Sequence, residues 1–305
     1  MKKHILKIAK TFDGLIFSKR TSSRSVQPTT HYDFSAAWEL SVPDSLQVSQ
    51  QNGILTIALH RPAVLNAIDL DMAEALLQHL EAASVDPAIR AIIITGKGRA
   101  FCAGGDLKFA VQANPEHPGD SFLILTTILH DSIEAIRTMA KPVVAAINGP
   151  AAGAGLFLAL ACDMRLMAHT AYLKQSNTSY GLSLPAGGTF SLPRLVGLGR
   201  ALEMVMLDRP IPAEEAQRVG LVTTVVKAGK LYAEAQMLAQ QAAQMPISTL
   251  GRVKRLMNES FDRSLVEQLA AEQQAIVKSA NSAEGREGLT AFLQKRKPAY
   301  VNLSA

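Results

Sequence analysis

The chain has little cysteine, few aromatic side chains and no long apolar run. Its 305 residues include two cysteines, Cys102 and Cys162, whose separation matches neither a metal-binding nor a redox motif. Aromatic residues make up 5% of the sequence, and no stretch reaches the roughly 20 apolar residues of a membrane-spanning helix. These absences exclude a disulfide scaffold, a cysteine-based metal site and a membrane span, and they favour a reducing, cytoplasmic location.

Outside the first thirty residues, neither positive nor negative charge is in excess. The net charge is +5, but residues 1–30 hold seven Lys or Arg and one acid, so the remainder carries 24 basic and 25 acidic residues. A nucleic-acid-binding protein needs a basic face on its folded body, and we therefore expect no nucleic-acid partner. We interpret residues 1–44 as a basic, flexible extension. An organelle transit peptide within residues 1–30 is the alternative.

Apolar patterning predicts an α/β protein. Period-two alternation and short apolar runs predict strands at 46–49, 54–59, 91–95, 143–147, 164–167 and 171–174. Helical spacing predicts helices at 69–83, 121–139, 156–161, 199–207, 213–219, 231–244, 248–258, 265–279 and 283–295. Strand–helix alternation followed by a helical tail implies a layered α/β core. We place this core at residues 45–245 and a helical C-terminal region at 246–305.

Two loops rich in small residues each follow an apolar strand. We call residues 101–107 the first loop and residues 148–155 the second loop. Small residues let the backbone approach a ligand closely, and the free N–H groups at the start of a helix favour negative charge. Two N–H groups that converge on one oxygen form an oxyanion hole. On spacing alone, plain packing of strand-to-helix turns is the alternative.

Several motifs, in order, resemble the enoyl-CoA hydratase/isomerase (crotonase) family over about residues 46–302. They lie at 61–67, 103–107, 141–155, 162–163, 215–222 and 287–298. The resemblance implies a crotonase-like spiral of ββα units and a helical C-terminal region that forms trimers, often as dimers of trimers. It also implies an acyl-CoA substrate, with coenzyme A present as part of that substrate, no separate cofactor and no metal.

The resemblance assigns site residues one by one. The oxyanion N–H groups fall on Ala103 and Ala154. Residues expected to contact the CoA or the acyl group are Ala63, Leu65, Ala67, Gly104, Gly105, Asp106, Leu107 and Phe157. The Asp106 side chain is best explained as a cap of the helix that follows it. Cys102 reads as an apolar filler, because no His or acid stands at a spacing that would activate it.

The two glutamates with which hydratases of this family handle water are missing. Phe157 and Asn177 occupy their positions, and the third glycine-rich loop, residues 181–188, has no acid. Because syn addition of water needs a positioned base, we expect isomerase, decarboxylase or C–C lyase chemistry in preference to hydration. The Asn177 amide, which could bind an acyl group or orient a water, is a candidate catalytic group. A non-catalytic acyl-CoA-binding oligomer is the alternative function.

Other polar side chains fall near the acyl pocket by family position. They are Asp71, Glu74, His130, Asp131, Lys174, Ser176, Tyr180 and Ser183. A lone histidine on an amphipathic helix is more often structural than catalytic. The last helices, residues 248–295, carry more apolar surface than a small domain can cover, which favours a trimer or hexamer.

Overall fold

The computed structural model describes residues 45–301 and residue 303. The predicted basic extension, with its transit-peptide alternative, lies outside the described residues. Residues 41–305 cluster as one unit, so the boundary at 245/246 stays a prediction. No helix in the described part of the chain is long and apolar enough to cross a membrane.

The main sheet has six strands in the order β1-β2-β3-β4-β6-β9. Their bounds are β1 Leu46–Gln51, β2 Ile54–Leu59, β3 Ala91–Gly96, β4 Val143–Ile147, β6 Met164–Ala168 and β9 Thr224–Val226. β1 is antiparallel to β2, and the other neighbouring pairs are parallel. β2 and β4 are buried along their whole length, as expected for strands covered on both faces.

A smaller sheet holds β5, β7 and β8 in that order. Its strands are β5 Ala151–Ala152, β7 Tyr172–Lys174 and β8 Ile211–Pro212. The helices are α2 Leu70–Val85, α3 Leu107–Ala113, α4 Pro118–Thr138, α5 Ala154–Ala161, α6 Gly188–Val196, α7 Leu198–Leu207, α8 Ala213–Arg218, α9 Leu231–Ala243, α10 Ile247–Glu259, α11 Leu265–Ala280 and α12 Ala283–Leu293.

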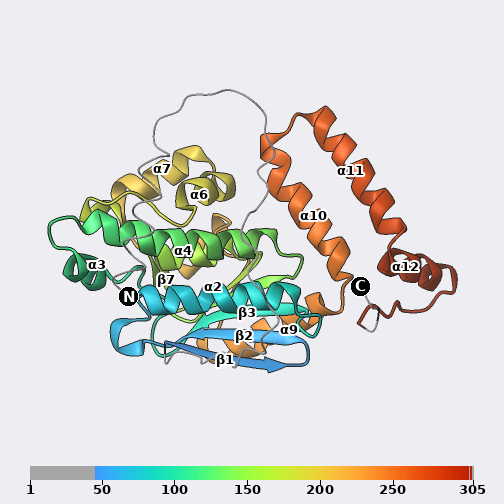
Figure 1. Ribbon diagram of the computed structural model, residues 1–305, viewed down its shortest axis with the longest axis horizontal. Coiled ribbons are helices and arrows are strands. Elements are labelled where there is room, and N and C mark those ends of the chain that lie inside the picture. Colours follow the sequence, from blue (N-terminus) through green and yellow to red (C-terminus); the bar gives the residue numbers. More distant parts are fainter. Residues whose placement is uncertain (1–44, 302, 304–305) are drawn as a thin grey trace, which may run out of the picture. The chain divides into compact units, whose positions relative to one another are not determined.

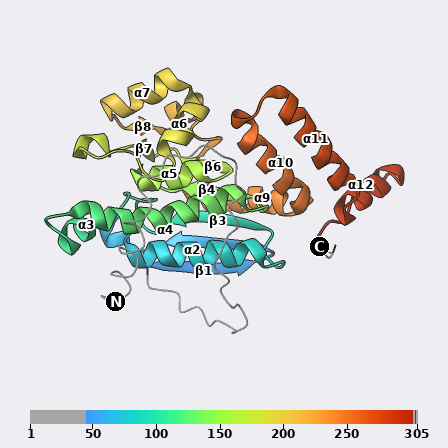
Figure 2. The same ribbon diagram turned by 45° about the horizontal axis from the view of Figure 1, so that its top comes forward.

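Helices cover both faces of the main sheet. α2 and α4 lie side by side and pass in front of the strands in Figure 1, whereas α9 packs behind them on β2, β3 and β4. Figure 2 shows α10 and α11 side by side, with α12 beyond them, away from α2. The described residues therefore place the C-terminal helices beside the sheet layers, with α10 resting on α4.

Local chemistry explains the elements around the site. The Asp69 side chain accepts the Met72 N–H at 3.0 Å and caps α2. α4 starts with Pro118 at its first turn, where a missing N–H costs nothing. Its buried positions recur every three or four residues, as one apolar helix face requires.

The structure differs from the sequence prediction mainly after the third loop. The sequence predicts no helix between 181 and 198, yet α6 forms there with Pro193 inside it. Pro193, the sixth of nine residues, lacks the N–H that would donate to the Thr189 carbonyl, so the sequence pattern indicates a break at this point. The short strands β5, β8 and β9 were also missed, because two or three residues are too few to show a period.

Candidate active site

The first and second loops lie at one edge of the main sheet. They follow β3 and β4, which are parallel neighbours, so their carboxyl ends point the same way. This edge is where parallel α/β sheets usually bind ligands. The N–H of Ala152 in the second loop donates to the carbonyl of Cys102 in the first at 2.8 Å. The two loops are therefore joined backbone to backbone.

Two glycines allow this close approach. A Cβ added to Gly104 would lie 3.1 Å from the carbonyl oxygen of Ala152 and 3.4 Å from the nitrogen of Ala154. Gly104 has φ +104° and Gly153 has φ +50° with ψ −128°, conformations that favour glycine. The start of α5 consequently sits directly against the first loop.

The first turn of α5 presents free N–H groups. Within the described residues, no acceptor is assigned to the N–H of Ala154, Gly155 or Leu156. The intrahelical ladder begins with the Phe157 N–H, which donates to the Gly153 carbonyl at 3.2 Å. Unsatisfied N–H groups and the helix dipole together make this end of α5 favourable for negative charge.

The structure argues against Ala103 as an N–H donor to a ligand. Its N–H donates to the Leu65 carbonyl at 2.9 Å, and this bond fixes the predicted CoA loop to the first loop. Two residues on, the Gly105 N–H has no assigned acceptor among residues 45–301. Sequence reasoning did not single out the Gly105 N–H, because nothing in the motif reveals which of its N–H groups pairs with Leu65.

Arg61 ties the predicted CoA-binding residues together. Its Nη1 donates to the Ala67 carbonyl at 2.6 Å and to Asp106 Oδ2 at 3.0 Å, and its Nη2 lies 3.1 Å from Asp69. Buried Asn66 donates to the carbonyls of Lys97, Ala100 and Phe101, which anchors the same turn. Ala63 lies exposed in the short 3-10 helix of this turn, residues Pro62–Val64.

Asp106 acts as a helix cap, as predicted. Its Oδ1 accepts the N–H groups of Lys108 and Phe109, at 3.1 and 3.3 Å, at the start of α3. Since Oδ2 holds Arg61, both oxygens of this carboxylate are engaged. Leu107, the first residue of α3, is exposed beside Asp106.

Phe157 is fully buried beneath the second loop. Its side chain is 0% exposed, and a Cβ added to Gly188 would lie 2.7 Å from its ring. The ring therefore packs against the first residue of α6, in the third loop. An aromatic ring in this place neither transfers a proton nor binds water.

Asn177 brings an unpartnered amide oxygen to the second loop. Its Oδ1 is buried and has no hydrogen-bond partner within the described residues, and a Cβ added to Gly153 would lie 3.5 Å from it. The segment is fixed by buried Asp208, which accepts the Ser176 N–H at 2.8 Å and pairs with Lys174 at 3.7 Å. A buried acceptor without a partner costs free energy unless a ligand or water supplies a donor.

The remaining polar candidates either bind other parts of the fold or are exposed. His130 Nε2 accepts the Ala186 N–H at 3.0 Å and links α4 to the third loop. Lys174 is held by Asp208. Asp131 and Tyr180 are exposed. The structure gives no interaction that draws Asp71 or Glu74 to the two loops.

The side chain of Cys102 is fully buried. Burial raises the pKa of its thiol to about 12, and a Cβ added to Gly155 would lie 2.6 Å from its Sγ. The side chain is an apolar filler under the start of α5, as the sequence predicted. No group of three or more His, Cys, Asp or Glu side chains within residues 45–301 is arranged to hold a metal ion.

Comparisons with known proteins agree with this architecture. A family model described as enoyl-CoA hydratase/isomerase matches residues 49–302. An Escherichia coli 1,2-epoxyphenylacetyl-CoA isomerase is 35% identical over 252 residues, covering 82% of this chain and 96% of the relative. An E. coli 2,3-dehydroadipyl-CoA hydratase is 34% identical, covering 84% and 98%.

Solved structures match over similar lengths. An enoyl-CoA hydratase from a Polaromonas species superposes with a TM-score of 0.79 at 37% identity, covering 83% of this chain and 98% of the other. An enoyl-CoA hydratase from Bacillus anthracis gives 0.79 at 33% identity, covering 85% and 100%. The crotonase-like fold expected from the motifs is confirmed.

Proposed function

The chain belongs to the enoyl-CoA hydratase/isomerase family, and we propose that it stabilises a thioester enolate through the N–H groups of Gly105 and Ala154. Members of this family act on acyl-CoA and need no cofactor besides the CoA of the substrate. The observation that carries the proposal is the pair of unoccupied N–H groups on two touching loops. A thioester carbonyl gains negative charge as the enolate forms, and fixed donors stabilise that charge most.

Gly105 replaces Ala103 in this assignment, because the Ala103 N–H already serves the Leu65 carbonyl. Leu65, Ala67 and Ala63 remain the proposed contacts of the CoA. Ala154 keeps its role from the sequence. The two donors come from separate loops whose spacing is set by Gly104 and Gly153.

We propose that the reaction is a decarboxylation, a C–C cleavage, or an isomerisation whose proton is moved by a side chain other than Phe157 and Asn177. Plain hydration needs a base to activate water and an acid to protonate carbon, and Phe157 and Asn177 provide neither. A decarboxylation needs no base to release CO₂, so enolate stabilisation is its main requirement. The Asn177 amide is placed to bind a polar group of the acyl chain beside the second loop.

The test is to assay three reactions on one preparation of the full chain: crotonyl-CoA hydration, double-bond isomerisation of 3-hexenoyl-CoA, and malonyl-CoA decarboxylation. Since each acid or base contributes about 10²–10⁴-fold, hydration is expected to fall at least two orders of magnitude below a typical hydratase. One of the other reactions should be faster. Crotonyl-CoA hydration at the rate of a typical hydratase would contradict the proposed reaction class.

Variants sharpen this assay. Asn177→Glu and the pair Phe157→Glu with Asn177→Glu should raise hydration, since they restore the missing acids. The single variant separates the contribution of position 177 from that of position 157, because it leaves the buried Phe157 ring intact. Tight binding of CoA thioesters with none of the three activities would instead support the alternative function, a non-catalytic acyl-CoA-binding oligomer.

A further inference from the structure

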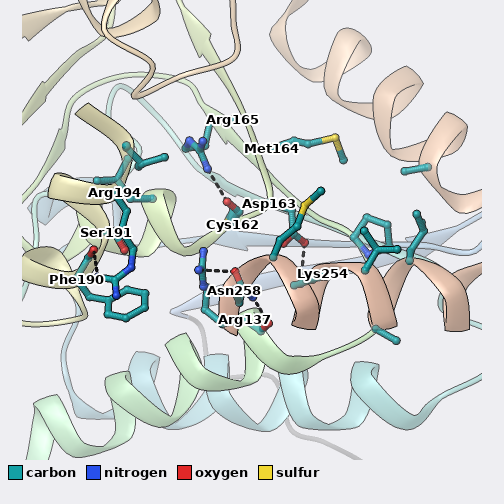
Figure 3. A pocket seen from close by; sticks show the side chains of 18 of the residues that line it. Arg137, Cys162, Asp163, Met164, Arg165, Phe190, Ser191, Arg194, Lys254 and Asn258 are labelled. Atoms are coloured by element: carbon teal, nitrogen blue, oxygen red, sulfur yellow. Dashed lines mark hydrogen bonds and ion pairs between the residues drawn. The ribbon is translucent and has the colours of Figure 1, made fainter. Parts of the chain in front are cut away.

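A second cavity lies away from the two loops. It has a volume of about 540 Å³ and is bounded by α4, α6, β6 and α10. Figure 3 shows its side chains from close by. It shares no lining residue with the first or second loop, so it is separate from the proposed thioester site. Its volume falls in the range of small-molecule sites.

The cavity carries an excess of positive charge. Four cationic side chains line it, and Asp163 is the one carboxylate among its lining residues. The cations are Arg137, Arg165, Arg194 and Lys254. Lys254 Nζ lies 2.8 Å from Asp163 Oδ2, and this pair neutralises itself. Three guanidinium groups therefore remain without a carboxylate among the lining residues.

Two of these guanidinium groups bind only neutral oxygens. Arg165 donates from Nε to the Leu221 carbonyl at 2.7 Å and from Nη1 to the Cys162 carbonyl at 2.6 Å. Arg137 donates from Nη2 to the side-chain oxygen of Asn258 at 2.5 Å. Neither residue forms a salt bridge with a carboxylate in the part of the chain that the structure describes.

The third guanidinium, that of Arg194, also has a neutral oxygen as acceptor, because its Nη1 donates to the Phe190 carbonyl at 3.1 Å. It stacks on the Phe190 ring at 3.5 Å and lies 5.0 Å from the Phe261 ring. Its Nε is buried and has no partner among the described residues. Its one ion pair is with Asp262 at 3.7 Å, and the side chain of that acid is 68% exposed. Water screens such a pair strongly.

Arg137 also repels the other two guanidinium groups. Burial lowers the pKa of Arg137, and the charge of Arg194 lowers it further, against an opposite effect of Asp163. Burial also lowers the pKa of Arg165. Cys162 and Asp163 oppose that effect, and the charge of Arg137 adds to it more weakly. Clustered positive charges removed from water are costly unless a counter-ion joins them.

We propose that this cavity binds an amphipathic monocarboxylate, such as a medium-chain fatty acid anion, with its carboxylate among Arg137, Arg165 and Arg194. Planar guanidinium groups suit carboxylate geometry, often with two parallel hydrogen bonds. The remaining walls are largely apolar, from Val253 and Met257 on α10 to Leu195 on α6, and they accept the hydrocarbon chain. A small inorganic anion would leave these walls unused.

The experiment is titration of octanoate into the full-length protein by calorimetry, with thermal denaturation in parallel. Octanoate is expected to bind and to raise the melting temperature, because a ligand that binds only the folded state stabilises it. Octanol, which has the same chain but no charge, should bind at least tenfold more weakly. Arg194→Met and Arg137→Met should each weaken octanoate binding by tenfold or more.

The controls make each result decisive. Arg218→Met, on the exposed side of α8, should leave octanoate binding unchanged, and acetyl-CoA should not compete with octanoate. If Arg137→Met fails to fold, Arg194→Met alone carries the test. Equal binding of octanol, competition by acetyl-CoA, or unchanged affinity in Arg194→Met would each overturn the proposal. The proposal would also be overturned if the parent protein did not bind octanoate and Arg194→Met changed the oligomeric mass. That result would show that the cavity belongs to an interface between chains.

Discussion

At the scale of single residues, backbone amides matter more here than side chains. A backbone N–H can stabilise a developing charge only if no carbonyl of the chain already accepts it. The Ala103 N–H is held by Leu65, whereas the N–H groups of Gly105 and Ala154 are open within the described residues. The side chains around them are small or apolar. The chemistry that we propose therefore depends on the positions of two peptide groups.

Replacing Gly105 by Pro removes one of these donors, since proline has no N–H. We expect turnover to fall about 10²–10³-fold, the usual effect of losing one oxyanion donor. Gly105→Ala is the matched control. It keeps the N–H, and its Cβ would meet Leu125 Cδ2 at an ordinary 3.5 Å, so its rate should stay within severalfold of the parent. Equal rates for the two variants would contradict the assignment of Gly105.

The two buried thiols give a second prediction at this scale. Burial raises the pKa of both Cys102 and Cys162 to about 12, and the thiolate is the reactive form. We expect the native protein to react with iodoacetamide at pH 8 far more slowly than the urea-unfolded protein, with mass spectrometry as the readout. Rapid alkylation of native Cys102 would show that the first loop opens and would reinstate this residue as a candidate nucleophile.

At the scale of elements, hydrophobic periodicity predicts most of the chain well. The hairpin of β1 and β2 is confirmed, with Asn52 at φ +52° and Gly53 at φ +77° as a tight two-residue turn requires. β4 begins and ends as expected. These elements are predictable because their apolar residues face a core whose geometry repeats every two or 3.6 residues.

The pairing of loops is beyond such patterns. The hydrogen bond from the Ala103 N–H to the Leu65 carbonyl joins residues that are 38 positions apart. No local hydrophobic pattern predicts such a contact. The same holds for Asp163 and Lys254, which lie 91 positions apart. Motif resemblance pointed to two loops that the structure brings together, but proposing a donor within a loop required the hydrogen bonds themselves.

The Lys254–Asp163 pair holds α10 against the sheet layers. Lys254 Nζ also donates to the Ile136 carbonyl at 2.6 Å, and Asp163 accepts the Val143 N–H at 2.8 Å. Both side chains are largely buried, at 12% and 24% exposure. Removing one member of such a pair leaves a charge without its partner in a poorly hydrated place.

We therefore expect Lys254→Met to lower the free energy of unfolding by about 3 kcal/mol in urea denaturation, the lower end for a broken buried pair. The exposed Lys230→Met should change it by less than about 0.5 kcal/mol. In a double-mutant cycle, Asp163→Asn added to Lys254→Met should cost less than the two single effects together. Additive losses would mean that the two charges do not act as a pair.

At the scale of the whole molecule, the last two helices leave many large apolar side chains uncovered. Phe292 and Leu293 on α12 are 80% and 79% exposed, and Val266 on α11 is 77% exposed. Leu265, Leu269, Ile276, Val277 and Leu289 are also exposed on these helices. An apolar surface of this extent on two adjacent helices is typical of a protein interface. We propose that it is covered by further copies of this chain.

Light scattering on the full chain at micromolar concentration is expected to give the mass of three or six chains. Phe292→Glu with Leu293→Glu should shift that mass toward a single chain, because burying two carboxylates in an apolar interface costs several kcal/mol. Val85→Glu is the control. Val85 is equally exposed, at 80%, but it ends α2, apart from α11 and α12, so the mass should not change. A monomeric parent protein would remove the proposal, and loss of assembly in Val85→Glu would move the interface to α2.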